Sequence, residues 1–196
     1  MTAFTLRPLG DGDEAALHDL HRACPIEADF HFYFDRGPDF FAWPGAVYDA
    51  HAYLGAERGG ALVGAVMVAE ADGWVGDAPG RWFYLGDARV APAARGLGVA
   101  PATAAALFAS RAPEVGLGVG LVKRGNAPAE RATAAGRVPG FFTSRLCDYD
   151  AANLMLLVGL GRPRGVRVRR ATEADVEAVC ALTREAWRGR LLAPTL

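Results

Sequence analysis

The alternation of apolar and polar positions at the start of the chain predicts a strand followed by a helix. Residues 4–9 alternate with the period of a half-buried strand. Asp11 or Asp13 can cap the helix that follows. Its apolar positions recur at helical spacing, at Leu17, Leu20 and Cys24. This segment is therefore expected to be an amphipathic helix that packs one face on the body of the protein.

Farther along the chain, apolar segments of strand length alternate with helical ones. Strands are expected at 51–55, 61–69, 82–90 and around 117–121, with a final hairpin at 141–147 and 153–158. Helices are expected over about 98–110 and 127–135. The aromatic segment 30–43 is interrupted by Gly37 and Pro38, which favours a loop with helical turns that could line a pocket. Strands and helices mixed in this way indicate an α/β or α+β domain.

The beginning of this pattern occurs twice. An offset of 162 residues aligns the first segment with the C-terminal segment without a gap. The matched pairs are Arg7 with Arg169, Asp13 with Asp175, Ala16 with Ala178, Leu20 with Leu182 and Arg22 with Arg184. A repeat of this length indicates a duplicated domain. We therefore expect one domain over 1–160 and the start of a second, truncated copy over 161–196.

The second copy is too short to be stable by itself, because two short elements bury too little apolar surface. It is expected to dock on the first domain, to pair with another chain, or to stay mobile. Pairing would give a homodimer through the C-terminal segment.

Composition places the chain among globular proteins. It has 196 residues, of which 52% are apolar and 22% charged, and its formal net charge is −1. No apolar run approaches the ~18 residues of a membrane span, and the N-terminus lacks the basic and apolar regions of a signal peptide. Three cysteines without a C-x-x-C spacing argue against a disulfide scaffold or a zinc cluster. These features favour a cytoplasmic protein without a membrane partner.

Charge is distributed unevenly along the chain. The first 158 residues carry a net charge of −5, and the remainder carries +4. An acidic body argues against a nucleic-acid partner, which requires a basic patch. The arginines near the boundary alternate with valines and are interpreted as one solvated face of a strand: Arg162, Arg164, Arg167, Arg169 and Arg170.

Two other kinds of active site find no support in the sequence. His18 and His21 are three residues apart on a helix, but no third ligand accompanies them, so no metal site is expected. Ser110 and Ser144 are the only serines, and neither lies in the G-x-S-x-G turn of a hydrolase.

Residues 95–100 have the features of a phosphate-binding turn. They follow a predicted strand, precede a predicted helix and include Gly96 and Gly98. The amides at a helix N-terminus bind anions because the helix dipole lies behind them, and glycines let the backbone approach a ligand closely. Arg95 adds positive charge. The alternative is a turn in which the glycines serve only tight packing.

This segment resembles the acetyl-CoA-binding motif of the GNAT acetyltransferase superfamily, Arg/Gln-x-x-Gly-x-Gly/Ala. The residues that match family positions are Arg95, Gly98 and Ala100 in the motif, with Val90, Pro92 and Asn126 around it. The segments YLGDARV, PDFF and GRVPGFF resemble an uncharacterised tandem-domain branch of the superfamily. The resemblance implies a mixed, mostly antiparallel central sheet flanked by helices, with a C-terminal strand and helix from the second copy.

The resemblance also implies acetyl-CoA as the co-substrate, without a metal. Its pyrophosphate would lie on the turn at 95–100, and its pantetheine arm along the end of the preceding strand. The expected cofactor-binding residues are Ala88, Arg89, Val90, Arg95, Gly96, Leu97, Gly98, Val99, Ala100 and Asn126. Alternating glycines at Gly116, Gly118 and Gly120 fit a strand that a ligand approaches closely, although a bulky neighbouring helix would explain them equally well.

Catalytic residues follow from the same resemblance. Asp87 matches the position of a family carboxylate that accepts the proton of the acceptor amine; alternatively, it pairs with Arg89 or orders a loop. A backbone N–H near Val90 would stabilise the oxyanion. Many relatives have a tyrosine acid where this chain has Thr133, and Tyr149 is the candidate replacement.

Two functions are therefore weighed. The first is an N-acetyltransferase that transfers an acetyl group from acetyl-CoA to an amine of a small molecule or a peptide. The second is a non-catalytic acyl-CoA-binding or pairing half of a tandem protein. Asp87 and the turn at 95–100 favour the first function, whereas Thr133 and the short second copy favour the second.

Overall fold

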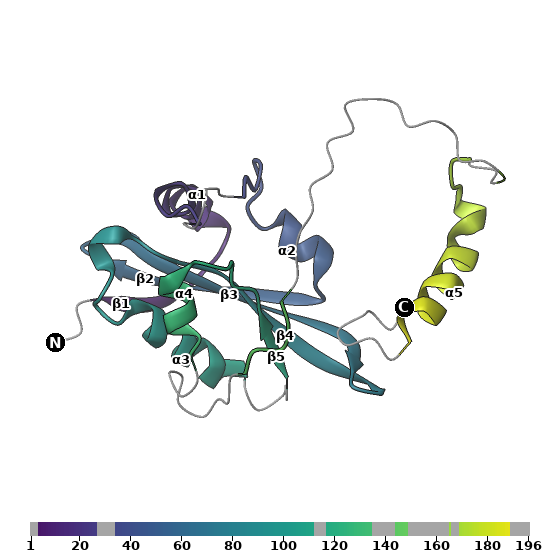
Figure 1. Ribbon diagram of the computed structural model, residues 1–196. Helices are drawn as coiled ribbons and strands as arrows, with labels where there is room; N and C mark the ends of the chain where they lie inside the picture. The colour runs from purple at the N-terminus through teal and green to yellow at the C-terminus, as the bar shows by residue number, and fades with distance from the viewer. Residues whose placement is uncertain are drawn as a thin grey trace.

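The computed structural model describes residues 4–26, 34–111, 117–134, 144–148, 165 and 169–188. Its centre is a sheet of five strands in the order β1-β2-β3-β4-β5 (Figure 1). The strands are β1 (Thr5–Leu9), β2 (Ala50–Arg58), β3 (Ala61–Val75), β4 (Ala78–Val90) and β5 (Gly118–Gly120). The first four pair antiparallel, and β4 pairs with β5 in parallel. The prediction of a mixed, mostly antiparallel sheet is confirmed.

Helices lie on both faces of this sheet (Figure 1). On one face are α1 (Glu14–Ala23) and α2 (Ala42–Val47), and on the other is α3 (Val99–Arg111). The core under α1 contains Leu17, Leu20, Phe40, Tyr53 and Met67. The core under α3 contains Val66, Val68, Phe83, Leu107 and Phe108. The sequence predicted both long helices, and flanking helices are confirmed.

Strand β3 contributes to both cores. Successive side chains of a strand point to opposite faces, and here Met67 packs with α1 while Val66 and Val68 pack with α3. All three side chains are at most 3% exposed. A strand that is buried on both faces needs apolar residues at every position, which explains why the segment VGAVMVA shows no alternation.

The hairpin of β3 and β4 is longer than the sequence predicts. Strands are expected at 61–69 and 82–90, but the two strands pair as far as Val75 and Ala78. Gly76 adopts a φ of +67° in the connecting turn. Apart from Trp74 and Val75 the added residues are small or polar, so apolar periodicity does not mark them. Backbone pairing and the turn glycine define this extension instead.

Three smaller expectations are wrong in detail. Helix α4 (Ala127–Ala132) ends before residue 135, and β5 is shorter than 117–121. Residues 144–148 have no regular structure, although a strand is predicted at 141–147. Leu146 in this segment is 67% exposed, so its side chain is not part of the core. The rest of the predicted hairpin lies outside the described residues.

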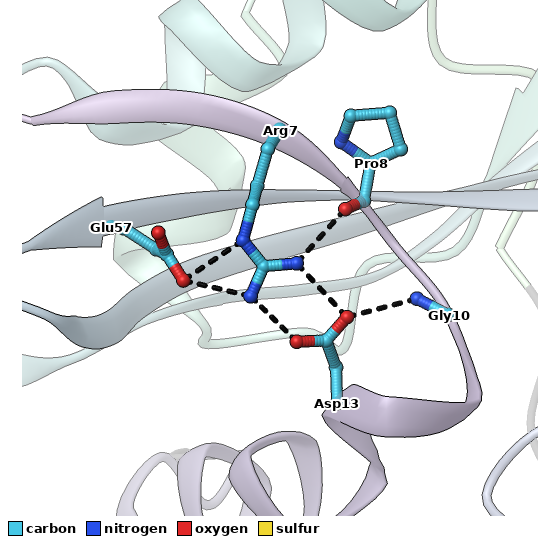
Figure 2. Close-up of polar contacts among 5 residues, drawn as sticks. All are labelled: Arg7, Pro8, Gly10, Asp13 and Glu57. Carbon is cyan, nitrogen blue, oxygen red and sulfur yellow. Dashed lines mark hydrogen bonds and ion pairs between the residues drawn. The ribbon is translucent and has the colours of Figure 1, made fainter.

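An arginine–aspartate module joins the first strand to the first helix (Figure 2). Arg7 donates hydrogen bonds to the two carboxylate oxygens of Asp13, at 2.6 and 3.0 Å, and to the carbonyl of Pro8 at 3.0 Å. The same carboxylate accepts the N–H of Gly10. Arg7 also donates to Glu57 on β2, at 2.7 and 2.9 Å. This module therefore ties the entrance of α1 to the sheet.

The module recurs at the predicted repeat. Arg169 donates to both carboxylate oxygens of Asp175 and to the carbonyl of Arg170, and the N–H of Thr172 donates to Asp175 at 2.7 Å. Each module includes a short 3-10 helix that ends at its aspartate, η1 (Asp11–Asp13) in the first copy and η3 (Glu173–Asp175) in the second. Helix α5 (Val176–Trp187) then takes the place of α1. The arginine–carboxylate, arginine–carbonyl and backbone N–H contacts are the same in both copies, whereas the Glu57 contact belongs to the first copy and a hydrogen bond from the Thr172 hydroxyl to Asp175 to the second.

The two matched helices differ in burial. Leu17 and Leu20 of α1 are 0% and 4% exposed, whereas Val179 and Leu182 at the matched positions of α5 are 53% and 72% exposed. In Figure 1, α5 stands clear of the sheet. Within the described residues, the turn and helix of the second copy therefore have no sheet beneath them. The strand predicted before this helix falls largely outside the described residues.

Candidate active site

Strand β4 contains a bulge near its C-terminal end. The register with β3 shifts between Ala65 and Met67, so that Asp87 and Ala88 both lie opposite Val66. Asp87 has a φ of +50°, the single positive value of a non-glycine residue in the part of the chain that the structure describes. A bulge bends the strand and redirects the side chain of the extra residue. Here it brings the Asp87 carboxylate to the face covered by α1 and α2.

Strands β4 and β5 separate just before this bulge. Their parallel pairing covers residues 83–85 of β4, whereas β4 continues to Val90. On its β5 side, the edge over 86–90 has no partner strand within the described residues. Such an edge offers backbone N–H and C=O groups to an extended ligand. The predicted pantetheine-binding residues Ala88, Arg89 and Val90 lie on it.

The alternating glycines of β5 have a simpler cause than a ligand. A Cβ atom added to Gly118 would lie 2.1 Å from the ring of Phe83 on β4. The ring of Phe83 packs in turn on Phe108 of α3. Gly118 therefore makes room for an aromatic side chain of the neighbouring strand. Gly120 adjoins the backbone of β4, and Gly116 lies outside the described residues.

The predicted phosphate turn lies directly after β4. Gly96 and Gly98 have φ values of +82° and +80°, and neither would crowd an added Cβ atom. Their conformation, rather than close packing, therefore requires glycine. The first bond of α3 runs from the N–H of Ala102 to the carbonyl of Gly98. The amides of Val99 and Ala100 precede it and are available to an anion.

Exposure of this turn is compatible with ligand binding. Residues 95–98 are exposed, whereas Val99 is buried and anchors the start of α3 in the core. The hydroxyl of Thr103 donates to the carbonyls of Val99 and Ala100, which stiffens the first helical turn. The turn thus combines a rigid base with an accessible rim, and the residues present fit a bound pyrophosphate.

Asn126, which is predicted to bind the co-substrate, has a separate structural role. It is the N-cap of α4, and its Oδ1 accepts the N–H of Ala129 at 3.3 Å. Thr133 ends the same helix, and its hydroxyl donates to the carbonyl of Ala129 at 2.9 Å. The Thr133 hydroxyl is thus directed into its own helix. Tyr149, the candidate acid, lies outside the described residues.

Asp87 is held by two side chains from other elements. Nη2 of Arg36 donates to both carboxylate oxygens, at 2.8 and 2.7 Å, and the Tyr53 hydroxyl donates to Oδ2 at 2.8 Å. Arg36 and Asp87 are each only 8% exposed. Arg36, rather than Arg89 as one alternative proposed, is the ion-pair partner. It comes from the segment between α1 and α2.

Aromatic side chains surround this ion pair. The guanidinium of Arg36 lies 4.3 Å from the ring centroid of Trp43 and 5.9 Å from that of Phe34. Trp43 contacts Tyr48 edge to face, and Tyr48 stacks on Tyr84 of β4 at 5.8 Å. The aromatic segment divides between core and site, since Phe40 is fully buried. A carboxylate and an aromatic face together form an environment for a cation.

Burial changes the ionisation of the neighbouring groups. Desolvation lowers the pKa of His21, which is 2% exposed, to about 4, so the imidazole is neutral at pH 7. Burial also raises the pKa of the Tyr53 hydroxyl, with the Asp87 charge adding to the effect, so this hydroxyl stays protonated. Burial lowers the pKa of Arg89. Tyr53 is therefore a permanent hydrogen-bond donor to Asp87.

Sequence reasoning missed Arg36 and Tyr53. Neither belongs to a motif, and both are distant from Asp87 along the chain. The one available signal was a charged pair, Asp35 and Arg36, inside an otherwise aromatic segment. A charge in such surroundings needs a partner, but the sequence does not say which one.

Comparison with family models identifies the fold family. Residues 14–134 match the acetyltransferase (GNAT) family. The chain belongs to this family. The match runs from α1 to α4. It therefore includes the bulge in β4, the point where β4 and β5 separate, and the glycine turn. No match was found among curated protein sequences.

Solved GNAT structures share the fold at low identity. An aminoglycoside 6'-N-acetyltransferase from Acinetobacter haemolyticus is 14% identical, with a TM-score of 0.53 over 76% of this chain and 99% of that chain. A ribosomal-protein-alanine N-acetyltransferase from Brucella melitensis is 20% identical, with a TM-score of 0.51 over 76% and 100%. A predicted acetyltransferase with acetyl-CoA from Clostridium acetobutylicum is 14% identical, with a TM-score of 0.50 over 72% and 96%.

Two absences hold for the described residues. No helix there is long and apolar enough to cross a membrane. No group of three or more histidine, cysteine, aspartate or glutamate side chains there is arranged to hold a metal ion.

Proposed function

We propose that this GNAT protein transfers an acetyl group from acetyl-CoA to an amine. One arrangement carries the proposal: β4 bulges and leaves β5 immediately before an exposed turn with two left-handed glycines. A thioester bound along the open edge of β4 would lie beside Asp87, and its pyrophosphate would reach the turn.

Binding of the co-substrate is assigned to the backbone. The amides of Gly96, Gly98, Val99 and Ala100 would hold the pyrophosphate, with Arg95 adding charge. Leu97 lies on the exposed rim, and its own N–H donates to the carbonyl of Ala94. The edge at Ala88, Arg89 and Val90 would hold the pantetheine arm by strand-like hydrogen bonds. Asn126 contributes by capping α4, the helix that comes after β5 in the chain.

Asp87 is the proposed general base. In the reaction the amine nitrogen bonds to the thioester carbonyl carbon, the carbon–sulfur bond breaks, and the amine proton passes to the Asp87 carboxylate. A backbone N–H near Val90 would stabilise the negative charge that develops on the carbonyl oxygen. Tyr53 keeps the carboxylate in position through its hydrogen bond. The Arg36 contact must loosen for a carboxylate oxygen to accept a proton.

Protonation of the departing thiolate is the less defined half of the reaction. The hydroxyl of Thr133 bonds to its own helix, so it is a poor substitute for a tyrosine acid. Tyr149 stays our candidate for this role, with solvent water as the alternative proton source. Replacing Tyr149 by Phe distinguishes them, because only a direct role predicts a loss of kcat.

The acceptor is proposed to be an amine of a small molecule or a peptide. Structural neighbours include an aminoglycoside acetyltransferase and a ribosomal-protein-alanine acetyltransferase, one acting on each kind of molecule. A non-catalytic acyl-CoA-binding protein is the second candidate, which the closed Arg36–Asp87 pair and Thr133 favour. Binding without turnover would select this second function.

The phosphate turn provides the first test. Gly98→Ala introduces strain at a φ of +80° and should weaken acetyl-CoA binding, measured as a smaller rise in melting temperature at saturating co-substrate. Gly60→Ala is a matched control, because Gly60 also has a φ of +80° with open space around it but lies in the β2–β3 turn. Equal losses of binding in both variants would contradict a phosphate role for the turn.

The base provides the second test. Asp87→Asn should lower turnover by roughly 10²-fold or more, measured as free thiol released from acetyl-CoA with a panel of amines. Asparagine tolerates a positive φ, so the bulge should persist. Unchanged kcat would remove Asp87 from the mechanism, and absence of any acetyl-CoA binding by the native protein would exclude both candidate functions.

The chain is proposed to consist of a GNAT domain over 1–160 and the start of a second copy over 161–196. The repeated arginine–aspartate module supports this division. The exposed face of α5 is proposed to pair two chains into a homodimer. A cytoplasmic location is proposed as well, supported by Cys147 and Cys180, which are thiols rather than disulfide halves.

A further inference from the structure

We propose that Arg36 is an internal placeholder for the acceptor, occupying a cation pocket that the acceptor's ammonium group enters when Arg36 withdraws. The inference rests on the proposed acetyl transfer for its catalytic meaning, but the pocket itself can be tested without acetyl-CoA. It assigns the acceptor to amines that arrive as cations.

The walls of this pocket have the chemistry of an organic-cation site. Asp87 supplies a buried negative charge, and the Trp43 ring supplies a π face 4.3 Å from the guanidinium carbon. The Tyr53 hydroxyl, on β2, donates a hydrogen bond to Asp87 and fixes the carboxylate. A carboxylate joined to aromatic faces attracts ammonium and guanidinium groups and repels anions.

The pocket is located where an acceptor must bind. Asp87 is the bulged residue at which β4 turns away from β5, next to the open edge proposed for the thioester. An ammonium at the position of Nη2 would lie within hydrogen-bond distance of both carboxylate oxygens, which Arg36 now contacts at 2.8 and 2.7 Å. Asp87 could then accept one proton from the ammonium, which leaves a neutral amine that can attack the thioester. The second proton, lost as the amide forms, passes through water to the departing thiolate.

Arg36 fills this pocket imperfectly. A single nitrogen, Nη2, serves both carboxylate oxygens, whereas a well-matched arginine presents two nitrogens in a fork. Its Nε is buried and has no hydrogen-bond partner among the described residues. A buried donor without a partner weakens the closed arrangement. Arg36 also lies outside any helix or strand, so its side chain can leave without breaking secondary structure.

Displacement conserves the local charge. Arg89 and the neutral His21 lie close enough to Asp87 and Arg36 to affect one another's ionisation. Exchange of the Arg36 guanidinium for one ammonium keeps the charge balance between Asp87 and Arg89 unchanged. An acceptor with a carboxylate would instead seek Arg89, and this second possibility is an outcome of the experiment below.

The test uses three probes of one shape and different charge: butylammonium, butyramide and butyrate. Their binding to the native protein and to Arg36→Ala is measured by calorimetry and by thermal shift. Butylammonium should bind Arg36→Ala at least roughly tenfold more tightly than the native protein, because Arg36 no longer competes. Butyramide should not bind to either protein. Adding Trp43→Leu to Arg36→Ala should remove most of the gain.

Arg36→Gln is the second variant if Arg36→Ala does not fold, since glutamine keeps a polar side chain of intermediate length. Equal affinity of butylammonium for native and variant proteins would overturn the placeholder. Tight binding of butyrate in place of butylammonium would overturn the cation pocket and indicate an anion site at Arg89.

Kinetics separate this inference from acetyl transfer itself. With an amine that is turned over, Arg36→Ala should lower KM, whereas a merely structural arginine would lower kcat/KM on replacement. A gain in butylammonium affinity without turnover of any amine would support the pocket and contradict the transferase. Turnover with an unchanged or raised KM in Arg36→Ala would support the transferase and overturn the placeholder.

Discussion

Two opposite charges, on Arg36 and Asp87, lie almost entirely within the protein, each 8% exposed. Burying such a pair costs desolvation on both sides, and the attraction between the partners offsets it only while both are present. Asp87 also has a strained backbone, at a φ of +50°. Strain and buried charge at one residue are typical of functional sites, because folding alone would not select them.

This pair predicts a non-additive response of stability. Asp87→Asn should cost about 3 kcal/mol of unfolding free energy, because it leaves the Arg36 charge buried without its partner. Arg36→Met should cost a similar amount. The double variant should recover most of the loss, as measured by urea unfolding in a double-mutant cycle. Additive losses would show that the two charges do not depend on each other.

His21 makes a separate prediction about pH. Its pKa is about 4 in the folded protein against an ordinary value of 6.5. As the pH falls, the imidazole therefore takes up a proton in the unfolded chain before it does so in the folded protein. The contribution of neutral His21 to the free energy of unfolding is therefore fully present above pH 6.5. It falls as the pH drops toward 4, by up to about 1.4 kcal/mol per pH unit. Chemical unfolding at pH 7, 6 and 5 measures this slope.

The control variants separate His21 from other groups. His21→Leu should flatten the slope, whereas His18→Gln, on the same helix but only half-buried, should retain it. The carboxyl pKa of Asp13 is lowered by the hydrogen bond from Arg7, and that of Asp175 by the one from Arg169, so both groups titrate below this range. An identical slope in the native and His21→Leu proteins would contradict the assignment.

At the scale of elements, features that depend on local sequence could be predicted, whereas features that depend on contacts between distant segments could not. The strand at 4–9 and the helix after it carry apolar periodicity, and the helix near 98–110 is marked by an Ala-rich, apolar composition. All three elements are found. The turn at 95–100 is found because glycine chemistry is local. The bulge at Asp87 and the partner Arg36 depend on register and on contacts between distant segments, which no local pattern encodes.

Variants of Asn126 test whether this residue contacts acetyl-CoA directly or affects binding by stabilising α4. Asn126→Asp retains a side-chain acceptor at the N-cap and should keep both acetyl-CoA affinity and slow amide exchange in α4. Asn126→Ala removes the cap, should cost about 1 kcal/mol of local stability, and should weaken binding indirectly. Loss of acetyl-CoA affinity in both variants, with normal exchange in Asn126→Asp, would show direct contact with the co-substrate instead.

At the scale of the whole molecule, the repeat offers matched positions in different surroundings. Leu20 is 4% exposed and Leu182 is 72% exposed, although they correspond within the repeat. Leu20→Asp should lower stability by on the order of 3 kcal/mol or more, because it places a charge in the core. Leu182→Asp should leave the melting temperature of an isolated chain unchanged.

The same pair of variants tests the proposed homodimer. If α5 joins two chains, Leu182→Asp should shift the protein from dimer to monomer in sedimentation or light scattering. Glu185→Gln, also on α5 and exposed, is the control for a change of charge. A native protein that is monomeric at high concentration would contradict pairing through α5.

The arginine–aspartate module has a further consequence for the order of folding. Its ion pair spans six residues in each copy, and the second copy makes it without a contact to Glu57. Contacts so close in sequence close rapidly and need no distant segment. The entrance of α1 can therefore assemble while β2 is still unformed, and the strand that arrives later finds Arg7 already oriented to receive Glu57. The second copy thus shows that the ion pair and its turn do not require the contact with Glu57.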